Sequence, residues 1–348
     1  MSGLKSLARV TILGSGNQSG ESKVVIVTGA AGDLGRQTAI ELARYGRPAH
    51  IYIADLPREE AKKKEAIDRV IREAYDEPPP VDPKAKKQKQ VTTNDSTAAT
   101  DARAESPRSE VHFLDLDLGS FTSIRQCASD FKEREQHLDI LILNAGVLSV
   151  KPWTTSEGYE CHFGINYVGH ALLSRLLIPV MLRTQEEKKE NGRLVIVSSE
   201  GHMITPKGGI QFERVKTDQR NLSWNKRYGQ SKLALTCMTR DLAARYPQLT
   251  VAAVHPGRIA TGMGTSLVEN SRLVRMVTPV TKYITVPLTI GIRNHLWAAT
   301  SAKVISGSYY EPVGVLAKGS KLSQDESLIK KLSEWTDEEL KGRDYLES

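Results

Sequence analysis

The sequence is poor in cysteine and in long apolar segments, and each shortage excludes a class of protein. Three cysteines occur among 348 residues, and no C-x-x-C pair is present, so neither a disulfide framework nor a zinc finger is predicted. The longest apolar run, residues 171–182, contains Arg175 and is too short to cross a bilayer. No histidine has the sequence spacing to aspartate or cysteine that metal ligands usually show, so we predict no metal site.

Familiar catalytic and targeting motifs are also missing. The G-x-S-x-G elbow of serine hydrolases and the phosphate loop G-x-x-x-x-G-K-[ST] do not occur. The glycine-rich segment at 14–20 precedes the first apolar strand, so we interpret residues 1–22 as a flexible lead. The start of the chain has no secretory signal pattern, which predicts a cytoplasmic protein. The formal net charge is +7, but no nucleic-acid-binding motif accompanies it, and nucleic acid is not an expected partner.

The chain does contain a regular alternation of apolar strands and amphipathic helices. From Lys23 an apolar run (VVIVT) leads into a glycine turn, an amphipathic stretch and a second apolar run (HIYIA). This order is typical of a βαβ unit. The alternation continues through VHFLDLDL, LDILILNAG, RLVIVSS and LTVAAVHPG. It predicts an α/β fold, a single doubly wound (Rossmann) domain whose central parallel sheet is flanked by helices.

Two segments depart from this alternation. Residues 76–110 are rich in proline, lysine and small polar residues, which predicts a disordered insertion between the second helix and the third strand. In the tail, Ser323-x-x-Glu326 and Thr336-x-x-Glu339 have the spacing of capping boxes and predict two short helices. We therefore expect one domain over 23–314 and a helical tail over 315–348 that packs on it.

A tyrosine and a lysine four residues apart carry the clearest chemistry. On a helix, Tyr228 and Lys232 would share one face, and an ammonium beside a phenol lowers the pKa of the phenol. A phenol ordinarily ionises at about pH 10, so this lowering would let Tyr228 act as a general acid or base near neutrality. A solvated helical pair explains the motif equally well in isolation. Catalysis is favoured by the order in which other motifs precede this pair. They are a glycine turn at 28–35, an acid that closes the second strand, Asn-Ala-Gly, a helix with an asparagine, and Ser-Ser.

In this order the motifs resemble those of the short-chain dehydrogenase/reductase family over residues 23–314. TTSEGYECHFGINYVGHALL at 154–173 and RLVIVSSEGH at 193–202 are similar to its retinol-dehydrogenase-like branch. GSYYEPVG at 307–314 resembles fungal members that often serve in secondary metabolism. The resemblance implies an NAD(P)-dependent oxidoreductase that interconverts an alcohol and a carbonyl on a lipophilic small molecule. It also implies a homodimer or homotetramer that associates through the helices around Asn166 and Tyr228.

The same resemblance implies roles for individual residues. Ser199, with Ser198 as the alternative, would hydrogen-bond the substrate oxygen, Tyr228 would transfer the proton, and Lys232 would hold the cofactor ribose. Asn166 would kink its helix and hold a water that relays protons to Lys232. Asp117 with Leu118 would meet the adenine. The residues implied in cofactor binding are Gly29, Gly32, Asp33, Leu34, Gly35, Asp55, Asp117, Asn144, Tyr228, Lys232, Ile259 and Thr261.

Two acidic residues bear on the cofactor. Asp33 stands where the family has its middle glycine, and we expect it to cap the next helix with its charge turned away from a phosphate; the alternative is a weakened site. Asp55 closes the second strand, where an acid accepts hydrogen bonds from ribose hydroxyls and repels a 2′-phosphate. This favours NAD slightly over NADP, although Arg36 and Arg58 could hold that phosphate.

The remaining expectations concern the substrate pocket. His170 is expected to pack its helix and His202 to line the pocket. The segment between Ser199 and Tyr228 and the segment 262–287 are expected to form its apolar walls. The competing hypothesis is a catalytically silent nucleotide-binding protein that acts through protein contacts, suggested by Asp33 and the 76–110 insertion.

Overall fold

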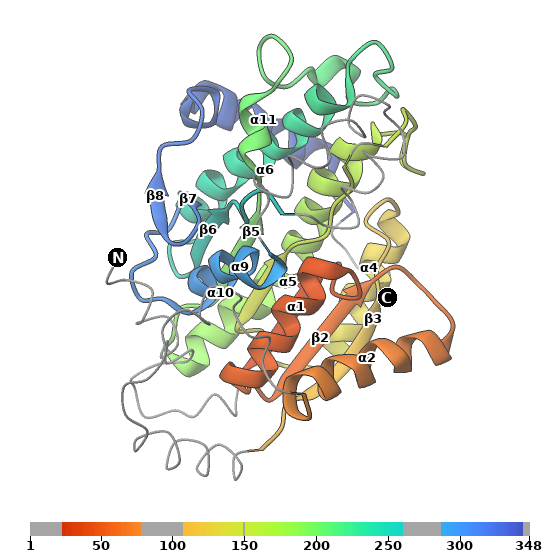
Figure 1. Ribbon diagram of the computed structural model, residues 1–348. Helices are drawn as coiled ribbons and strands as arrows, with labels where there is room; N and C mark the ends of the chain where they lie inside the picture. Colours follow the sequence, from red (N-terminus) through yellow and green to blue (C-terminus); the bar gives the residue numbers. More distant parts are fainter. Residues whose placement is uncertain (1–22, 78–106, 149, 260–286, 344–348) are drawn as a thin grey trace, which may run out of the picture.

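One eight-stranded sheet forms the centre of the molecule (Figure 1). The computed structural model describes residues 23–77, 107–148, 150–259 and 287–343, so the predicted lead and most of the predicted insertion lie outside the described residues. The strand order is β3-β2-β1-β4-β5-β6-β7-β8, and every neighbouring pair is parallel except β7 with β8. The predicted doubly wound α/β fold is confirmed. The strands are β1 Val24–Thr28, β2 His50–Asp55, β3 Glu110–Asp115, β4 Ile140–Leu143, β5 Arg193–Val197, β6 Thr250–Val254, β7 Ser308–Glu311 and β8 Val315–Ala317.

Helices cover both faces of the sheet, and the strands explain why. Successive strand residues point to opposite faces, so Ile26 and Tyr52 enter one apolar cluster while Val25 and Ile51 enter the other. Burial on both faces accounts for the continuous apolar runs in the sequence. One face is packed by α1 Asp33–Glu41, α2 Glu60–Tyr75 and α10 Arg293–Thr300, and the other by α4 Phe121–Arg134, α5 Gly169–Lys188 and α6 Trp224–Arg245.

The central helix α5 is preceded directly by a π-helical segment, η5 (Phe163–Val168). A π turn widens the helix locally and is often found at functional sites; here it contains Asn166, where the sequence led us to expect a kink. The combined helix Phe163–Lys188 has the length and apolar composition of a membrane-spanning helix, but 78% of its most apolar window is buried inside the fold. Such burial is typical of a core helix that packs against the sheet of an α/β fold.

The tail forms one helix where two were predicted. α11 (Glu326–Glu339) begins at Asp325, whose carboxylate accepts hydrogen bonds from the Ser327 and Leu328 amides. The prediction that Ser323 and Thr336 begin two helices is wrong. Leu328, Leu332 and Thr336 are buried at helical spacing on one face of α11, so packing carries the helix through Thr336 without interruption.

α11 lies against α6 (Figure 1), and Asp337 of α11 accepts a hydrogen bond from Arg175 of α5. The Tyr167 hydroxyl meets Thr336 Oγ1 at 2.5 Å, and Arg245 pairs with Asp337 at 2.8 Å. These contacts place α11 on a face of the two helices that the family resemblance assigned to subunit contacts. An association through α5 and α6 would therefore have to include α11 or use the surface it leaves open.

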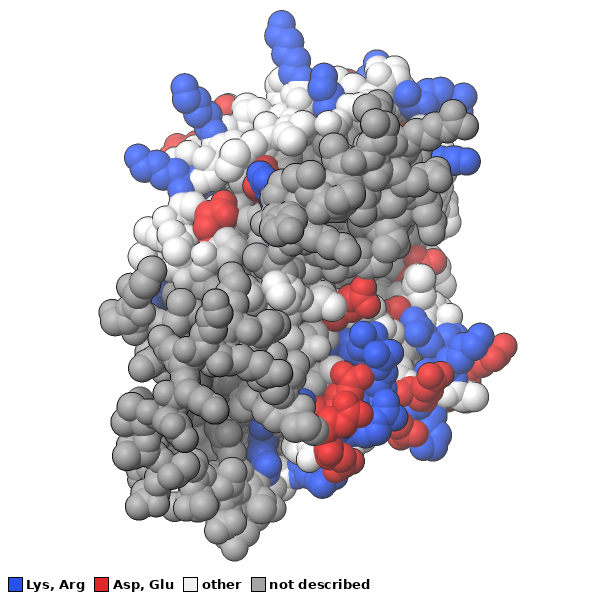
Figure 2. All heavy atoms as spheres, viewed as in Figure 1, with Lys and Arg blue, Asp and Glu red and all other residues white. Residues whose placement is uncertain are grey.

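The positive charge of the chain is interspersed with acidic side chains where the structure describes it. On the face shown in Figure 2, blue and red side chains alternate over the region of α2. Ion pairs along this helix join Lys63 to Glu60, Lys64 to Asp68 and Arg69 to Glu73. Neighbouring charges of opposite sign reduce the positive potential that would attract a polyanion to this face.

Candidate active site

A cleft of 780 Å³ opens at the carboxyl ends of β1, β2, β4, β5 and β6. This edge is where open α/β sheets bind their ligands, because the strand order reverses there. Asp117 and Asn166 are not among the residues that line the cleft, and Thr261 lies outside the described residues. The predicted site residues that line it are Gly29, Gly32, Asp33, Leu34, Gly35, Asp55, Asn144, Ser199, Tyr228, Lys232 and Ile259.

The glycine turn between β1 and α1 is built from close backbone contacts. Gly29 has φ +67°, and a Cβ there would lie 2.9 Å from the Cα of Ala145. A Cβ at Gly35 would lie 2.4 Å from the carbonyl oxygen of Gly29. Gly32 is the N-cap of α1 and supplies no side-chain cap. The first amides of α1 thus face the cleft with the positive end of the helix dipole, which fits the pyrophosphate of a dinucleotide.

Asp33 does not cap α1. It is the first residue of the helix, because Gly32 takes the N-cap position. Its Oδ1 lies 3.7 Å from a guanidinium nitrogen of Arg36, one turn further along. The capping prediction is wrong, although the neighbouring guanidinium offsets the carboxylate charge at the mouth of the turn.

Asp55 is held at the end of β2 by three donors. Its Oδ2 accepts from the Ala31 amide at 2.9 Å, and its Oδ1 accepts from the Leu56 amide at 2.9 Å and from Arg58 at 2.7 Å. The carboxylate is therefore fixed beside the glycine turn. Arg58 accompanies it, so an anion and a cation occupy the place where a ribose 2′ group would lie.

The side chain of Asp117 turns away from the cleft. Its Oδ1 accepts from the amide of Gly119 at 2.8 Å, as in an Asx turn. Leu116 and Leu118, on either side, line the cleft. Of the pair expected to meet the adenine, Leu118 therefore lines the cleft and Asp117 does not.

A hydrogen-bond network beneath the turn was missed by sequence reasoning. The His170 Nδ1 lies 2.9 Å from the carbonyl oxygen of Asn166, which can only accept, so Nδ1 carries the proton. The hydroxyl of Thr28 can then donate to His170 Nε2, 3.0 Å away, while Thr28 Oγ1 accepts from the amides of Asn144 and Ala145. Burial lowers the pKa of His170 to about 3, which keeps the ring neutral. The expected packing histidine thus also joins α5 to the glycine turn.

Asn166 supports the cleft from behind. Its side chain accepts from the Val147 amide at 2.8 Å and donates to the Val147 carbonyl and to Ser231 Oγ. A Cβ at Gly146 would lie 3.0 Å from Asn166 Oδ1 and 3.8 Å from Lys232 Nζ. The widened π turn therefore brings this amide between the Asn-Ala-Gly segment and Lys232.

Ser199, Tyr228 and Lys232 come together in the cleft. The Ser199 hydroxyl accepts from the Gly201 amide at 3.1 Å. It lies beside the Tyr228 ring, since a Cβ at Gly201 would be 3.4 Å from Ser199 Oγ and 2.9 Å from Cε1 of Tyr228. Lys232 Nζ lies 5.6 Å from the centre of the Tyr228 ring and donates to the carbonyl of Val197 at 2.8 Å. The helical spacing predicted this shared face, and α6 provides it.

The predicted lowering of the Tyr228 pKa is wrong for this site. Burial raises the pKa of Tyr228 to about 12, against a smaller lowering by the Ser199 hydrogen bond. Burial also lowers the pKa of Lys232 to about 7. Desolvation penalises the charged form of each group, so the amine loses much of the charge that the sequence argument relied on.

The other pocket residues divide between the cleft and the core. Ser198 Oγ bonds to Thr236 and to the Lys232 carbonyl, so it faces α6. The expectation that His202 lines the pocket is wrong: its Nδ1 bonds the Ser199 carbonyl and its Nε2 accepts from the Ser320 amide. From the segment between Ser199 and Tyr228, the side chains that line the cleft are those of Glu200, Ile204, Trp224 and Asn225.

A buried charged group lies behind Tyr228. Glu160, 0% exposed, bonds His162 Nδ1 at 2.7 Å and lies 3.8 Å from Nε of the buried Arg227. The His162 ring meets the ring of Tyr228 edge-on at 6.2 Å. Glu160 belongs to a segment that was noted only for its family resemblance. No local pattern in the sequence indicates that Glu160 and Arg227 meet.

The comparisons with known proteins agree with this geometry. The short chain dehydrogenase family matches residues 83–272. The chain belongs to the short-chain dehydrogenase/reductase family. It is 32% identical to mouse retinol dehydrogenase 12 over 83% of this chain and 77% of that protein, and 29% identical to the short-chain dehydrogenase/reductase drtF of Aspergillus calidoustus over 93% and 96%. These relatives place it in the retinol-dehydrogenase-like branch, as an NAD(P)-dependent oxidoreductase.

Solved structures share the fold. A crystal structure of a protein from Mycobacterium paratuberculosis matches with a TM-score of 0.62 at 24% identity, covering 91% of this chain and 92% of that one. L-sorbose reductase from Gluconobacter frateurii, solved with NADPH and L-sorbose, matches with a TM-score of 0.58 at 17% identity, covering 85% and 97%. At these identities the likeness concerns the fold alone.

Proposed function

We propose that this enzyme reduces a carbonyl group on a lipophilic small molecule to an alcohol, with Tyr228 as the proton donor. The observation that carries the proposal is the convergence of Ser199, Tyr228 and Lys232 inside the cleft onto which the glycine turn opens. A carbonyl oxygen seated beside these two hydroxyls would be within reach of both. Ser199 would stabilise the developing negative charge, and Tyr228 would neutralise it.

The raised pKa of Tyr228 supports reduction as the favoured direction. A phenol with a pKa of about 12 keeps its proton at neutral pH. A reduced nicotinamide supplies the hydride when bound. The alkoxide that the carbonyl becomes is more basic than a phenolate, so the proton passes from Tyr228 to the substrate oxygen. Lys232 lies near enough to the ring to stabilise the phenolate left behind when the amine is protonated.

Asp55 supports a slight preference for NAD over NADP. Its carboxylate stands at the ribose end of the cleft, where it repels a 2′-phosphate. Arg58, bonded to it at 2.7 Å, moderates that repulsion, so the preference is small.

The cleft wall beside Ser199 and Tyr228 supports a lipophilic substrate. Val147, Leu148, Ile204 and Trp224 line it, and Ile204 is 49% exposed, which leaves apolar surface for a substrate to cover. The retinol dehydrogenase names of relatives agree with this class. The resemblance to fungal members adds the proposal of a role in secondary metabolism.

A series of straight-chain aldehydes tests the proposal. Oxidation of NADH and NADPH by the full-length protein is measured with aldehydes of increasing length, with retinal, and with a polar ketose as control. We expect kcat/KM to rise about fourfold for each added methylene until the pocket is filled, since burying one contributes about 0.8 kcal/mol.

The variant Tyr228→Phe accompanies this series. It removes the proton donor and keeps the ring, so turnover should fall by about 10²–10⁴ while cofactor fluorescence titrations stay unchanged. A preference for the ketose would contradict the lipophilic substrate, and retained turnover in Tyr228→Phe would contradict the role of Tyr228.

A further inference from the structure

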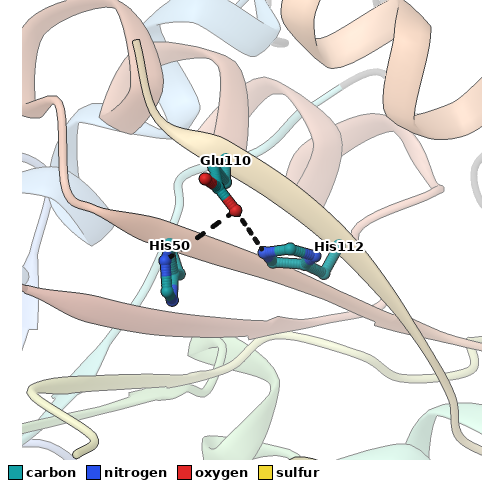
Figure 3. Close-up of side chains that lie close together, drawn as sticks. All are labelled: His50, Glu110 and His112. Atoms are coloured by element: carbon teal, nitrogen blue, oxygen red, sulfur yellow. Dashed lines mark ion pairs between the residues drawn. The ribbon is translucent and has the colours of Figure 1, made fainter. Parts of the chain in front are cut away.

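Three metal-ligand side chains meet at the edge of the sheet opposite the cleft. His50 begins β2 and Glu110 begins β3, and the two pair in register. His112 lies two residues beyond Glu110 and so shares its face of the sheet. The Glu110 carboxylate points between the two imidazole rings (Figure 3), with Oε2 3.9 Å from His50 Nε2 and 3.5 Å from His112 Nε2.

We propose that His50, Glu110 and His112 bind a zinc ion. Two ligand atoms each about 2.1 Å from a tetrahedral zinc lie about 3.4 Å apart, so the observed separations require only small side-chain rotations. Two imidazoles and one carboxylate suit zinc. Glu110 is exposed to solvent, which allows water to complete the coordination.

A buried carboxylate orients one of the imidazoles. His50 Nδ1 bonds Glu135, which also accepts from the Tyr52 hydroxyl at 2.9 Å. Glu135 is 7% exposed. A histidine that donates Nδ1–H to a carboxylate has its Nε2 lone pair free for a metal, the usual arrangement around metal-bound histidines. Here that lone pair is on the side of Glu110.

The second imidazole has an unused nitrogen. His112 Nε2 is buried and has no hydrogen-bond partner among the described residues, although Glu110 is 3.5 Å away. Buried polar nitrogens are normally satisfied, and a metal ion would satisfy this one. The positive charge of nearby Arg134 would repel a cation here. The two carboxylates of Glu110 and Glu135 would attract it and outnumber that charge.

This site would tie strands together without taking part in catalysis. β2 runs from His50 to Asp55, a rise of about 17 Å, so the ion would lie at the far edge from the cofactor end. It would join β3, the edge strand of the sheet, to β2. Sequence spacing could not reveal this cluster, because His50 and His112 are distant along the chain and meet only through the pairing of β2 with β3.

Zinc binding by the full-length protein tests the proposal. After dialysis against a chelator, zinc is titrated in by calorimetry, and bound metal is counted by mass spectrometry. We expect one zinc per chain and, at a hundredfold excess over Kd, a rise in Tm of about 5 °C. Glu110→Gln and His112→Ala should each abolish both effects, and Glu135→Gln should weaken binding about 10- to 100-fold.

His137→Ala is the matched control, because His137 and Glu187 form another surface histidine–glutamate pair. It should retain one zinc per chain. Glu110 is exposed, so Glu110→Gln should fold, and its unchanged cofactor binding verifies this. Absence of zinc binding, retention of the ion by Glu110→Gln, or its loss in His137→Ala would each overturn the proposal; the last would indicate adventitious surface binding.

Discussion

The two edges of the central sheet carry different titratable side chains and treat their charges in opposite ways. At the carboxyl edge, Tyr228 is half-buried and Lys232 is buried, and desolvation shifts the pKa of each in the direction that disfavours its charged form. At the amino edge, His50 and Glu110 are partly exposed, and each has an oppositely charged or polar partner. Burial therefore disfavours charge at the carboxyl edge, whereas solvent and neighbouring partners accommodate it at the amino edge.

This difference changes how the tyrosine and lysine pair is understood. The helical spacing of the motif correctly predicts that the two side chains share a face. It cannot predict that Lys232 is buried and Tyr228 half-buried, nor that desolvation of the phenol outweighs the attraction of an amine 5.6 Å from the ring centre. The protonated phenol then becomes the resting form, which suits a proton donor.

Removing a hydroxyl at the carboxyl edge should have the largest effect. Ser199→Ala deletes the hydroxyl that lies beside Tyr228 in the cleft and would stabilise the substrate oxygen, so kcat should fall by about 10²–10³. Ser198→Ala is the matched control, because that hydroxyl faces Thr236, and it should cost less than about tenfold. Steady-state kinetics compare the two, and an equal loss in both variants would show that the roles of the two serines are not separable.

Breaking the buried ion pair behind Tyr228 should have the next largest effect. Glu160→Gln leaves Arg227 buried opposite a neutral amide, so the free energy of unfolding should fall by about 3 kcal/mol. Denaturant titration measures it. The exposed pair of Lys23 and Glu190 supplies the control Glu190→Gln, expected to cost less than about 1 kcal/mol. Equal losses would mean that burial does not distinguish these pairs.

Lys232→Met should stabilise the cofactor-free protein while abolishing turnover. The pKa of Lys232 is about 7 in the folded state against 10.5 as a reference, so the unfolded chain binds more protons between these values. Stability of the native protein therefore rises with pH from about 7 to 10 and is lowest below 7. The shift alone corresponds to on the order of 4 kcal/mol at pH 7. Loss of the hydrogen bond from Lys232 Nζ to the Val197 carbonyl offsets part of this, so the variant should gain on the order of 2 kcal/mol.

Melting temperatures from pH 6 to 9.5 test this expectation. The native protein should approach the variant in stability as the pH rises. A difference between the two that stays constant with pH would show that Lys232 is not desolvated.

The smallest change concerns the cofactor. Asp55→Asn removes the charge that repels a 2′-phosphate and releases Arg58 from its partner, so the ratio of kcat/KM for NADPH over NADH should rise about tenfold. Asp33→Asn, at the turn that would hold the pyrophosphate, should affect both cofactors alike. If Asp33→Asn changed the ratio of kcat/KM for NADPH over NADH and Asp55→Asn did not, the roles assigned to the two acids would be reversed.

Local patterns in the sequence predicted most of the fold and the assembly of the cleft. Strand periodicity, the glycine turn and the spacing of Tyr228 and Lys232 are short-range signals, and each depends on geometry within one or two elements. Errors arose where distant segments meet. His202 accepts a hydrogen bond from the distant Ser320 amide, and Thr336 is buried inside α11, where its hydroxyl meets that of Tyr167. The error at Asp33 is local, since the adjacent Gly32 is the N-cap of α1.

The ionisation state of Tyr228 in the cofactor-free protein tests the central claim most directly. Protein labelled with carbon-13 at the tyrosine Cζ gives one resonance per tyrosine, and Tyr228→Phe assigns the relevant one. Because burial raises the pKa of Tyr228 to about 12, its resonance should keep the position of a neutral phenol through pH 10. A shift to the phenolate position near pH 8 would contradict the account. It would indicate that the charge of Lys232 lowers the pKa of Tyr228 more than desolvation raises it.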